Sequence, residues 1–298
     1  MRPGRRLTPY LLLTPALALF TFAVLGPIAA TAVFSFFEWN GFGTFEPIGI
    51  ANYLRAASDP IFRASFLHVG IYIALTIVLE VWVGLLLAGM VTARPRGTAF
   101  FRVAFFVPVM LPMVVVAVLW GFVYNPDFGL LNSALESFGL GSLSQIWLGD
   151  TRTALIAVSV VSGWVFAGFY MAIFNAGFRQ IPTDLIEAAR IEGATEVQTF
   201  WRIKVPMIRH VVELALLLCV TGGFQSFDLF YVLTNGGPFN ATEIPTTYLV
   251  KVVFRNQDVG YGSAMAVVMT IVVVAIGAIY LRLRRRRLGA SHTGQAMA

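Results

Sequence analysis

Residues 153–178 read TALIAVSVVSGWVFAGFYMAIFNAGF and contain no Asp, Glu, Lys or Arg. Because a helix needs about 20 apolar residues to cross about 30 Å of hydrocarbon, this stretch predicts a membrane span. Three other stretches lack charged residues: Leu7–Phe37, Val103–Pro126 and Val259–Leu281. Two more are interrupted only by acids: 64–93 by Glu80, and 211–241 by Glu213 and Asp228. These runs predict six transmembrane helices, at about 10–36, 65–92, 101–124, 153–177, 208–233 and 261–283.

The composition supports a membrane protein. Of 298 residues, 58% are hydrophobic and only 12% are charged, against about 25% charged in soluble chains. This excludes a soluble two-domain protein and a disordered chain. The single cysteine excludes a disulfide framework and a thiolate zinc site. The runs lack the alternation of barrel strands, so we expect an all-α polytopic membrane protein.

The positive charges predict the orientation. If the N-terminus is cytoplasmic, 16 of the 21 Lys and Arg residues lie inside and five lie outside. Both termini are therefore expected in the cytoplasm. The arginine-rich stretch 282–287 directly follows a span, which favours contact with anionic lipid over nucleic-acid binding. The first apolar run is long for a signal peptide, so we expect a retained helix.

The most polar segment on the predicted cytoplasmic side is Arg179–Arg209. Acidic residues after Pro182 predict a short helix capped by Thr183 or Asp184. A glycine ten residues later, Gly193, permits the left-handed backbone that ends such a helix. The mixed charges and apolar residues of this segment suit docking into a protein groove, although a helix lying on lipid headgroups is the open alternative.

A second short helix is expected to follow that bend. It begins near Thr195 and carries Phe200 and Trp201 among its apolar residues, and Pro206 breaks or kinks it before the fifth span.

A motif with fixed spacing runs through this segment. Its members are Glu187-Ala188-Ala189, Gly193 after three residues, Ile203 after nine more, and Pro206. The spacing resembles the EAA loop of binding-protein-dependent ABC importer permeases. Two departures, Glu192 for the usual Asp and Val205 for the usual Leu, keep charge sign and apolar character. Three further stretches are similar to the carbohydrate branch of that family: NPDFGLLN at 125–132, FDLFYVLTNGGP at 227–238 and YGSA at 261–264.

The resemblance covers nearly the whole chain and implies type I ABC importer permease architecture, with one permease domain over 1–298 and a coupling loop at 179–206. In the family this loop sits in a cleft of a separate ATPase. Carried over, Glu187 is the expected charged contact, Ala188 and Ala189 keep that face flat, and Gly193 makes the bend. The chain has no Gly-x-x-x-x-Gly-Lys-Ser/Thr phosphate loop, so it is not expected to be an ATPase, and ATP with Mg²⁺ would bind the partner.

The resemblance also implies partners and a location. The partners would be a second homologous permease subunit, two ATPase subunits and an extracytoplasmic sugar-binding protein. A heterodimer is expected and a homodimer stays open. The location would be a bacterial or archaeal cytoplasmic membrane.

Polar residues within the spans predict the transport path, because such residues usually face a cavity or a partner. Hydroxyl, amide and aromatic groups are what a neutral sugar needs. The candidates are Ser159, Ser162, Trp164, Phe166, Thr221, Gly223, Gln225, Ser226 and Asp228. Thr221, Gln225 and Asp228 lie at i, i+4 and i+7, so we expect them to share one face of the fifth helix. Helix packing through small and hydroxyl residues is the open alternative.

Glu80 leaves a rival function open. As a proton site, together with Asp228, it would suit a proton-coupled secondary transporter acting alone. A neutral Glu80 hydrogen-bonded between helices is the competing interpretation. A membrane enzyme would need clustered acids or a metal motif, and the acids are scattered. The leading prediction is a permease subunit of a carbohydrate importer. The outer loop at 37–64 packs over the path or meets the solute receptor.

Overall fold

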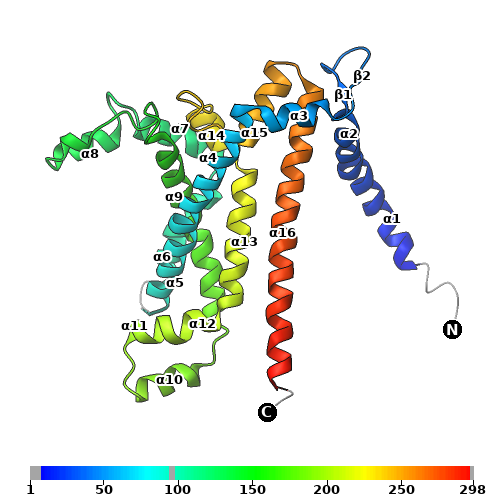
Figure 1. The fold of residues 1–298 in the computed structure, drawn as a ribbon. Coiled ribbons are helices and arrows are strands. Elements are labelled where there is room, and N and C mark those ends of the chain that lie inside the picture. The colour runs from blue at the N-terminus through cyan, green and yellow to red at the C-terminus, as the bar shows by residue number, and fades with distance from the viewer. Residues whose placement is uncertain (1–7, 94–97, 296–298) are drawn as a thin grey trace, which may run out of the picture. The chain divides into compact units, whose positions relative to one another are not determined.

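The computed structural model describes residues 8–93 and 98–295, which form two compact units (Figure 1). Of the described residues, unit 1 contains those up to Arg63 and Leu249–Ile276. Unit 2 contains Ala64–Tyr248 and those from Gly277 onward. Five of the arginines counted for orientation, Arg2, Arg5, Arg6, Arg94 and Arg96, lie outside the described residues.

Unit 1 begins with one apolar helical rod made of α1 (Thr8–Phe20), a π-helical stretch (Thr21–Leu25) and α2 (Gly26–Phe34). The chain then forms an antiparallel pair of short strands, β1 (Phe37–Glu38) and β2 (Glu46–Pro47), followed by α3 (Ala51–Ser58). The second part of unit 1 contains the π-helical stretch Lys251–Arg255 and the start of α16 (Val259–Gln295).

The predicted outer loop packs around the start of α16 within unit 1. Arg55 pairs with Asp258 at 2.6 Å, and its guanidinium carbon lies 4.0 Å from the centre of the Tyr261 ring. The Tyr261 hydroxyl donates to Asp59 at 2.8 Å. These contacts fix α3 to α16, so the loop forms a structured part of this unit.

Unit 2 contains the remaining elements. They are α4 (Pro60–Thr76), which begins in unit 1, α5 (Val83–Ala93), α6 (Thr98–Phe106), α7 (Met113–Val123), α8 (Leu130–Ser137), α9 (Ala154–Phe178), α10 (Thr183–Ile191), α11 (Glu196–Thr199), α12 (Val205–Met207), α13 (Arg209–Gln225), α14 (Asp228–Leu233) and α15 (Pro245–Val250). A π-helical stretch (Ile77–Trp82) joins α4 to α5, and another (Phe200–Lys204) joins α11 to α12. Short 3-10 turns occupy Val107–Met110 and Gly141–Leu143.

Glycine residues bring the helices of unit 2 into close contact. A Cβ on Gly84 of α5 would lie 2.7 Å from the Tyr170 Cβ of α9. A Cβ on Gly168 of α9 would lie 1.8 Å from the backbone oxygen of Phe105 in α6. Since lipid tails are as apolar as leucine, helices in a membrane associate mainly through such close packing. Two glycines of this unit therefore set the distances between α5, α6 and α9.

Two predicted spans are broken. The span predicted at 101–124 is divided into a pair of helices bent by 99°, because Pro108 and Pro112 cannot donate backbone hydrogen bonds. The span predicted at 208–233 ends as a helix at Gln225 and resumes as α14. Between them Ser226 is extended, and its carbonyl accepts the Thr246 hydroxyl at 2.5 Å instead of a helical amide.

The other predicted ranges are helical in the structure. The helix predicted at 153–177 is α9, Ala154–Phe178. By length and hydropathy, four helices of the described residues suffice to cross a membrane, and the bent pair adds a fifth. The all-α membrane fold is confirmed, while the count of six spans and the cytoplasmic termini stay predictions.

We expect Gly168→Ala to destabilise the protein, because the new methyl group meets a backbone oxygen that cannot move aside alone. The matched control is Gly70→Ala in α4, where nothing lies within 4 Å of the new Cβ. There, alanine gains about 1 kcal/mol of helix propensity. Thermal unfolding in detergent should show a lower Tm for Gly168→Ala and an unchanged or higher Tm for Gly70→Ala. Equal Tm values would contradict the close approach of α6 and α9.

Candidate functional site

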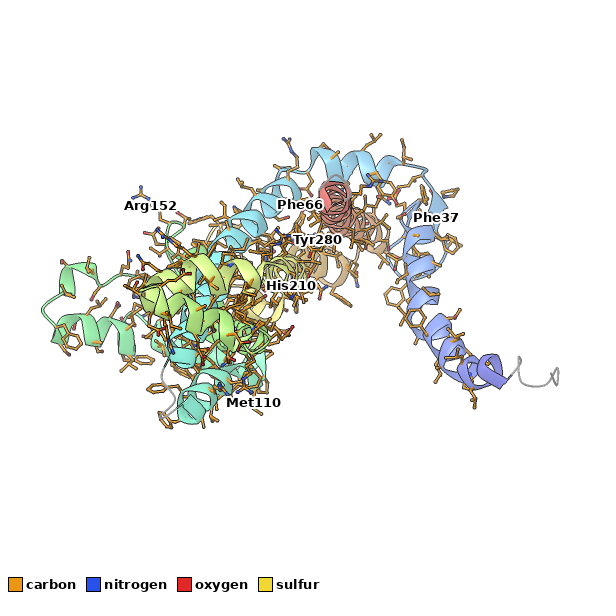
Figure 2. All side chains as sticks on the ribbon, turned by 90° about the horizontal axis from the view of Figure 1, so that it is seen from below. Phe37, Phe66, Met110, Arg152, His210 and Tyr280 are labelled. Carbon is orange, nitrogen blue, oxygen red and sulfur yellow. The ribbon has the colours of Figure 1, made fainter. Side chains whose placement is uncertain are left out.

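The α10–α12 segment, residues 179–207, forms two short helices joined by a tight bend. It lies across one end of unit 2, opposite the end that carries α8 and α14 (Figure 1). Figure 2 views the chain from this end, with His210 labelled where α13 begins. The segment is therefore a polar hairpin at one end of the apolar helices of unit 2.

Gly193 makes the bend as predicted, with a φ of +82°. The amide of Ala194 donates to the Ala189 carbonyl at 2.9 Å, and the amide of Gly193 donates to the Arg190 carbonyl at 3.0 Å. This pair of bonds is the Schellman ending of a helix, which favours glycine at the left-handed position. A salt bridge between Arg190 and Glu196, 2.7 Å long and largely exposed, spans the bend.

Both helices of the segment start near the predicted residues. At α11, Thr195 Oγ1 accepts from the Gln198 amide at 3.2 Å, and the Gln198 side chain accepts from the Thr195 amide at 2.9 Å. This capping box satisfies two amides that a helix start leaves free. At α10 the predicted cap is wrong. Pro182 takes the cap position, and Thr183 Oγ1 donates to Asp184 Oδ1 instead of capping the backbone.

Phe200 packs the α10–α12 segment against the helices of unit 2. A Cβ on Gly89 of α5 would lie only 2.5 Å from the Phe200 ring, so the glycine leaves the space that this ring fills. The centre of the Phe178 ring at the end of α9 lies 5.8 Å from that of Phe200. The aromatic ring therefore connects the segment to α5 and α9.

The motif residues divide between the open and the packed side of the segment. Glu187, Ala188, Gly193 and Pro206 are exposed. Ala189 is buried, with 7% of its surface accessible, and Ile203 is partly buried. The structure therefore places Glu187 and Ala188 where a partner can reach them, whereas Ala189 packs within the chain and does not contribute to an open flat face.

A cavity of about 520 Å³ lies between α4, α9, α13 and α14 in unit 2. Seven of the nine predicted path residues line it: Ser162, Phe166, Thr221, Gly223, Gln225, Ser226 and Asp228. The shared helix face predicted for Thr221, Gln225 and Asp228 is wrong, because the helix ends between Gln225 and Asp228. The break nevertheless leaves all three side chains at the same cavity.

Two predicted path residues lie elsewhere. Ser159 is fully buried and donates its hydroxyl to the Leu155 carbonyl of its own helix at 2.7 Å. Trp164 packs edge-on against Trp120, with ring centres 5.7 Å apart, and does not line the cavity. Both residues lie on α9 as expected, but neither lines the cavity.

Glu80 forms the polar centre of this cavity. Ser162 Oγ donates to Glu80 Oε1 at 2.7 Å, and the Tyr72 hydroxyl lies 2.8 Å from Ser162 Oγ. Cys219, predicted as a small buried apolar residue, is 3% exposed and lies 3.9 Å from Glu80 Oε2. The hydrogen bond from Ser162 of α9 to Glu80 of the π-helical stretch Ile77–Trp82 agrees with the interpretation of Glu80 as a hydrogen-bonded link between helices.

Tyr72, Thr76 and Tyr170 also line the cavity, although they are not among the predicted path residues. These residues could have been predicted from the sequence, because polar atoms within an apolar run need hydrogen-bond partners. Among the described residues that line the cavity, none is Lys, Arg or His. No group of three or more metal-ligating side chains occurs in the described part of the chain. The cavity therefore offers hydroxyl, amide, carboxyl and aromatic groups.

The family model for "Binding-protein-dependent transport system inner membrane component" matches residues 80–288. The probable ABC transporter permease protein YurN of Bacillus subtilis is 37% identical over 93% of this chain and 96% of its own. The probable starch degradation products transport system permease protein AmyD of Thermoanaerobacterium thermosulfurigenes is 30% identical over 93% of this chain and 94% of its own. A bacterial ABC transporter involved in the import of alginate has the same fold, with a TM-score of 0.84 over 95% of this chain and 96% of that one, at 19% identity.

The chain belongs to the family of binding-protein-dependent transport system inner membrane components. It is a multi-pass permease subunit of an ABC importer in the cytoplasmic membrane. Members of this family are transporters, and they work with ATPase subunits and a substrate-binding protein.

We expect Phe200→Ala to loosen the α10–α12 segment, because it removes the packing of this partly buried ring against Gly89 and Phe178. The cost should be smaller than the roughly 3–5 kcal/mol for a fully buried phenylalanine. Hydrogen exchange in residues 179–207 should become several-fold faster. Val197→Ala, on the same segment but 68% exposed, is the matched control and should leave exchange unchanged. Equal exchange in the two variants would show that Phe200 does not fasten the segment.

Proposed function

We propose that the importer carries a sugar or an oligosaccharide, and that this chain contributes the cavity of unit 2 to the transport path. The observation that supports this proposal is the set of side chains that line the cavity. Gln225 and Ser226 offer an amide and a hydroxyl, while Phe166 and Tyr170 offer aromatic rings. Sugar hydroxyls need hydrogen bonds, and the apolar face of a sugar ring stacks on aromatic side chains. The name of the relative AmyD, a permease for starch degradation products, supports this substrate class.

We further propose that the α10–α12 segment is the coupling element. Glu187 and Ala188 present an open surface to one ATPase subunit, and Gly193 holds the bend that sets the angle between the two helices. Ile203 is partly buried and belongs to the packed side of the segment, whereas Pro206 is exposed in the short helix α12 that leads to α13. ATP with Mg²⁺ binds two separate ATPase subunits, and this chain hydrolyses no ATP. A second, different permease subunit completes the path, and a sugar-binding protein delivers the solute on the outer face.

Motion would pass from the ATPase to the path through rigid helices. Phe200 connects the segment to α5 and α9, and α13 runs from α12 to the cavity at Gly223. Rigid elements in direct contact are a physical route for coupling between distant sites. The chain belongs to a family that works with ATPase subunits, which argues against the proton-coupled alternative through Glu80 and Asp228.

Gly193→Asp tests the coupling role. A side chain at φ +82° strains the bend, although nothing lies within 4 Å of the new Cβ, so the protein should still insert into the membrane. In proteoliposomes that contain the whole importer, we expect ATP hydrolysis to continue without solute uptake. Uptake that matches the unmodified importer would refute the role of the segment.

Gln225→Ala tests the transport path. Loss of one hydrogen bond to a solute costs about 0.5–1.5 kcal/mol, which corresponds to a roughly two- to tenfold higher KM for uptake. Ser159→Ala is the matched control, because this hydroxyl is bonded within its own helix. If Ser159→Ala raised the KM as much as Gln225→Ala, the path would not follow the cavity.

A further inference from the structure

The connection between α7 and α9 carries an amphipathic helix. Across α8 and its C-cap residue Phe138, the apolar residues Leu130, Ala134 and Phe138 recur every four positions, and Leu131 and Leu135 widen this apolar stripe. The polar residues Asn132, Ser133, Glu136 and Ser137 fall on the opposite side of the helix. A helix with this division has one face suited to water and one face suited to an apolar phase.

The two ends of this stripe are open within this chain, whereas Ala134 and Leu135 are partly buried and Leu131 packs against the core of unit 2. Leu130 is 69% exposed and Phe138 is 82% exposed. The residues after α8 continue the stripe, since Leu140, Leu143 and Ile146 are each close to half exposed or more. Contiguous exposed apolar residues of this kind mark an interaction surface.

A buried asparagine holds this surface in a fixed shape. Trp147 Nε1 donates to Asn132 Oδ1 at 2.8 Å, and Asn132 Nδ2 donates to the Gln145 carbonyl at 3.2 Å. Asn132 is 7% exposed. These hydrogen bonds hold the start of α8 against the residues before α9, so the stripe has a defined position in the fold.

Position and charge indicate what covers the stripe. Figure 1 shows α8, drawn in green, extending sideways from the bundle of unit 2 at the end opposite the α10–α12 segment. Its neighbours along the chain, α7 and α9, expose apolar side chains such as Phe122 and Ile156 that face lipid in a membrane-spanning protein. Between Phe128 and Trp147 the only charged residue is Glu136. The exposed residues of this stripe therefore resemble, in apolar character and in their scarcity of charge, the lipid-facing side chains of the helices before and after it in the chain.

We propose that residues 128–146 form a lipid anchor in the leaflet opposite the α10–α12 segment. The apolar stripe lies roughly 5–10 Å deep in the boundary between headgroups and acyl chains, as in other interfacial helices. Glu136 and Ser133 face water. The anchor fixes the ends of α7 and α9 relative to the bilayer, and it does not depend on which solute the importer carries.

Fluorescence quenching on the assembled importer tests the anchor. In a Cys219→Ser background, with the other subunits free of cysteine, Phe138→Cys and Glu136→Cys are each labelled with the fluorophore NBD. The importer is reconstituted in vesicles of phosphatidylcholine and phosphatidylglycerol. We expect the label at position 138 to emit at shorter wavelength and to be quenched several-fold more by an acyl-chain nitroxide than the label at 136. Iodide in the water should show the reverse order.

A third label at Leu143→Cys should behave like the label at position 138. Equal quenching by iodide at all three positions would overturn the anchor. So would a label at position 138 that is open to iodide in vesicles and becomes shielded only when the substrate-binding protein is added, since the stripe would then be a protein-docking surface. ATP-driven uptake by each labelled importer verifies that it is assembled.

Discussion

The contact between α5 and α9 is the constraint on which the rest of unit 2 depends. Gly84 brings the two helices so close that a single added Cβ would overlap Tyr170 and the Ala167 carbonyl. Close packing is the main force available between helices surrounded by lipid, because there is no hydrophobic gain from leaving a solvent that is itself apolar. Five residues further along α5, Gly89 leaves the space that Phe200 occupies. The same helix thus fixes both the bundle and the polar segment at its end.

The cavity depends on the same arrangement. Glu80 lies in the π-helical stretch before α5, and its bond to Ser162 crosses to α9. A polar group within a membrane span needs a partner, so this bond stabilises the helix contact as well as lining the cavity. The break between α13 and α14 then turns Ser226 and Asp228 toward the same space. Helix contact and cavity lining share residues, which explains how motion of the helices would reshape the path.

The sequence predicted those features that follow from local chemistry. Apolar length defined α9 to within one residue at each end. The expected start near Thr195 agrees with α11, which Thr195 caps, and glycine predicted the bend at Gly193. Features that depend on distant residues could not be predicted from the local pattern. The helix break at Ser226 uses the Thr246 hydroxyl, 20 positions away, and the Glu80–Ser162 bond joins residues 82 positions apart. For the same reason, Ser159 and Trp164 have side chains suited to binding a sugar, but the local pattern could not show that they do not line the cavity.

Cross-linking from position 187 tests the coupling role most directly. A photoreactive label on Glu187→Cys, in the assembled importer with Cys219→Ser, should react with the ATPase subunit, and its yield should change when ATP is trapped. The same label on Arg152→Cys, at the other end of unit 2, should not reach that subunit. If the label at position 187 reacted only with lipid, whether or not ATP was bound, the α10–α12 segment would lie on the membrane and could not transmit the motion of the ATPase.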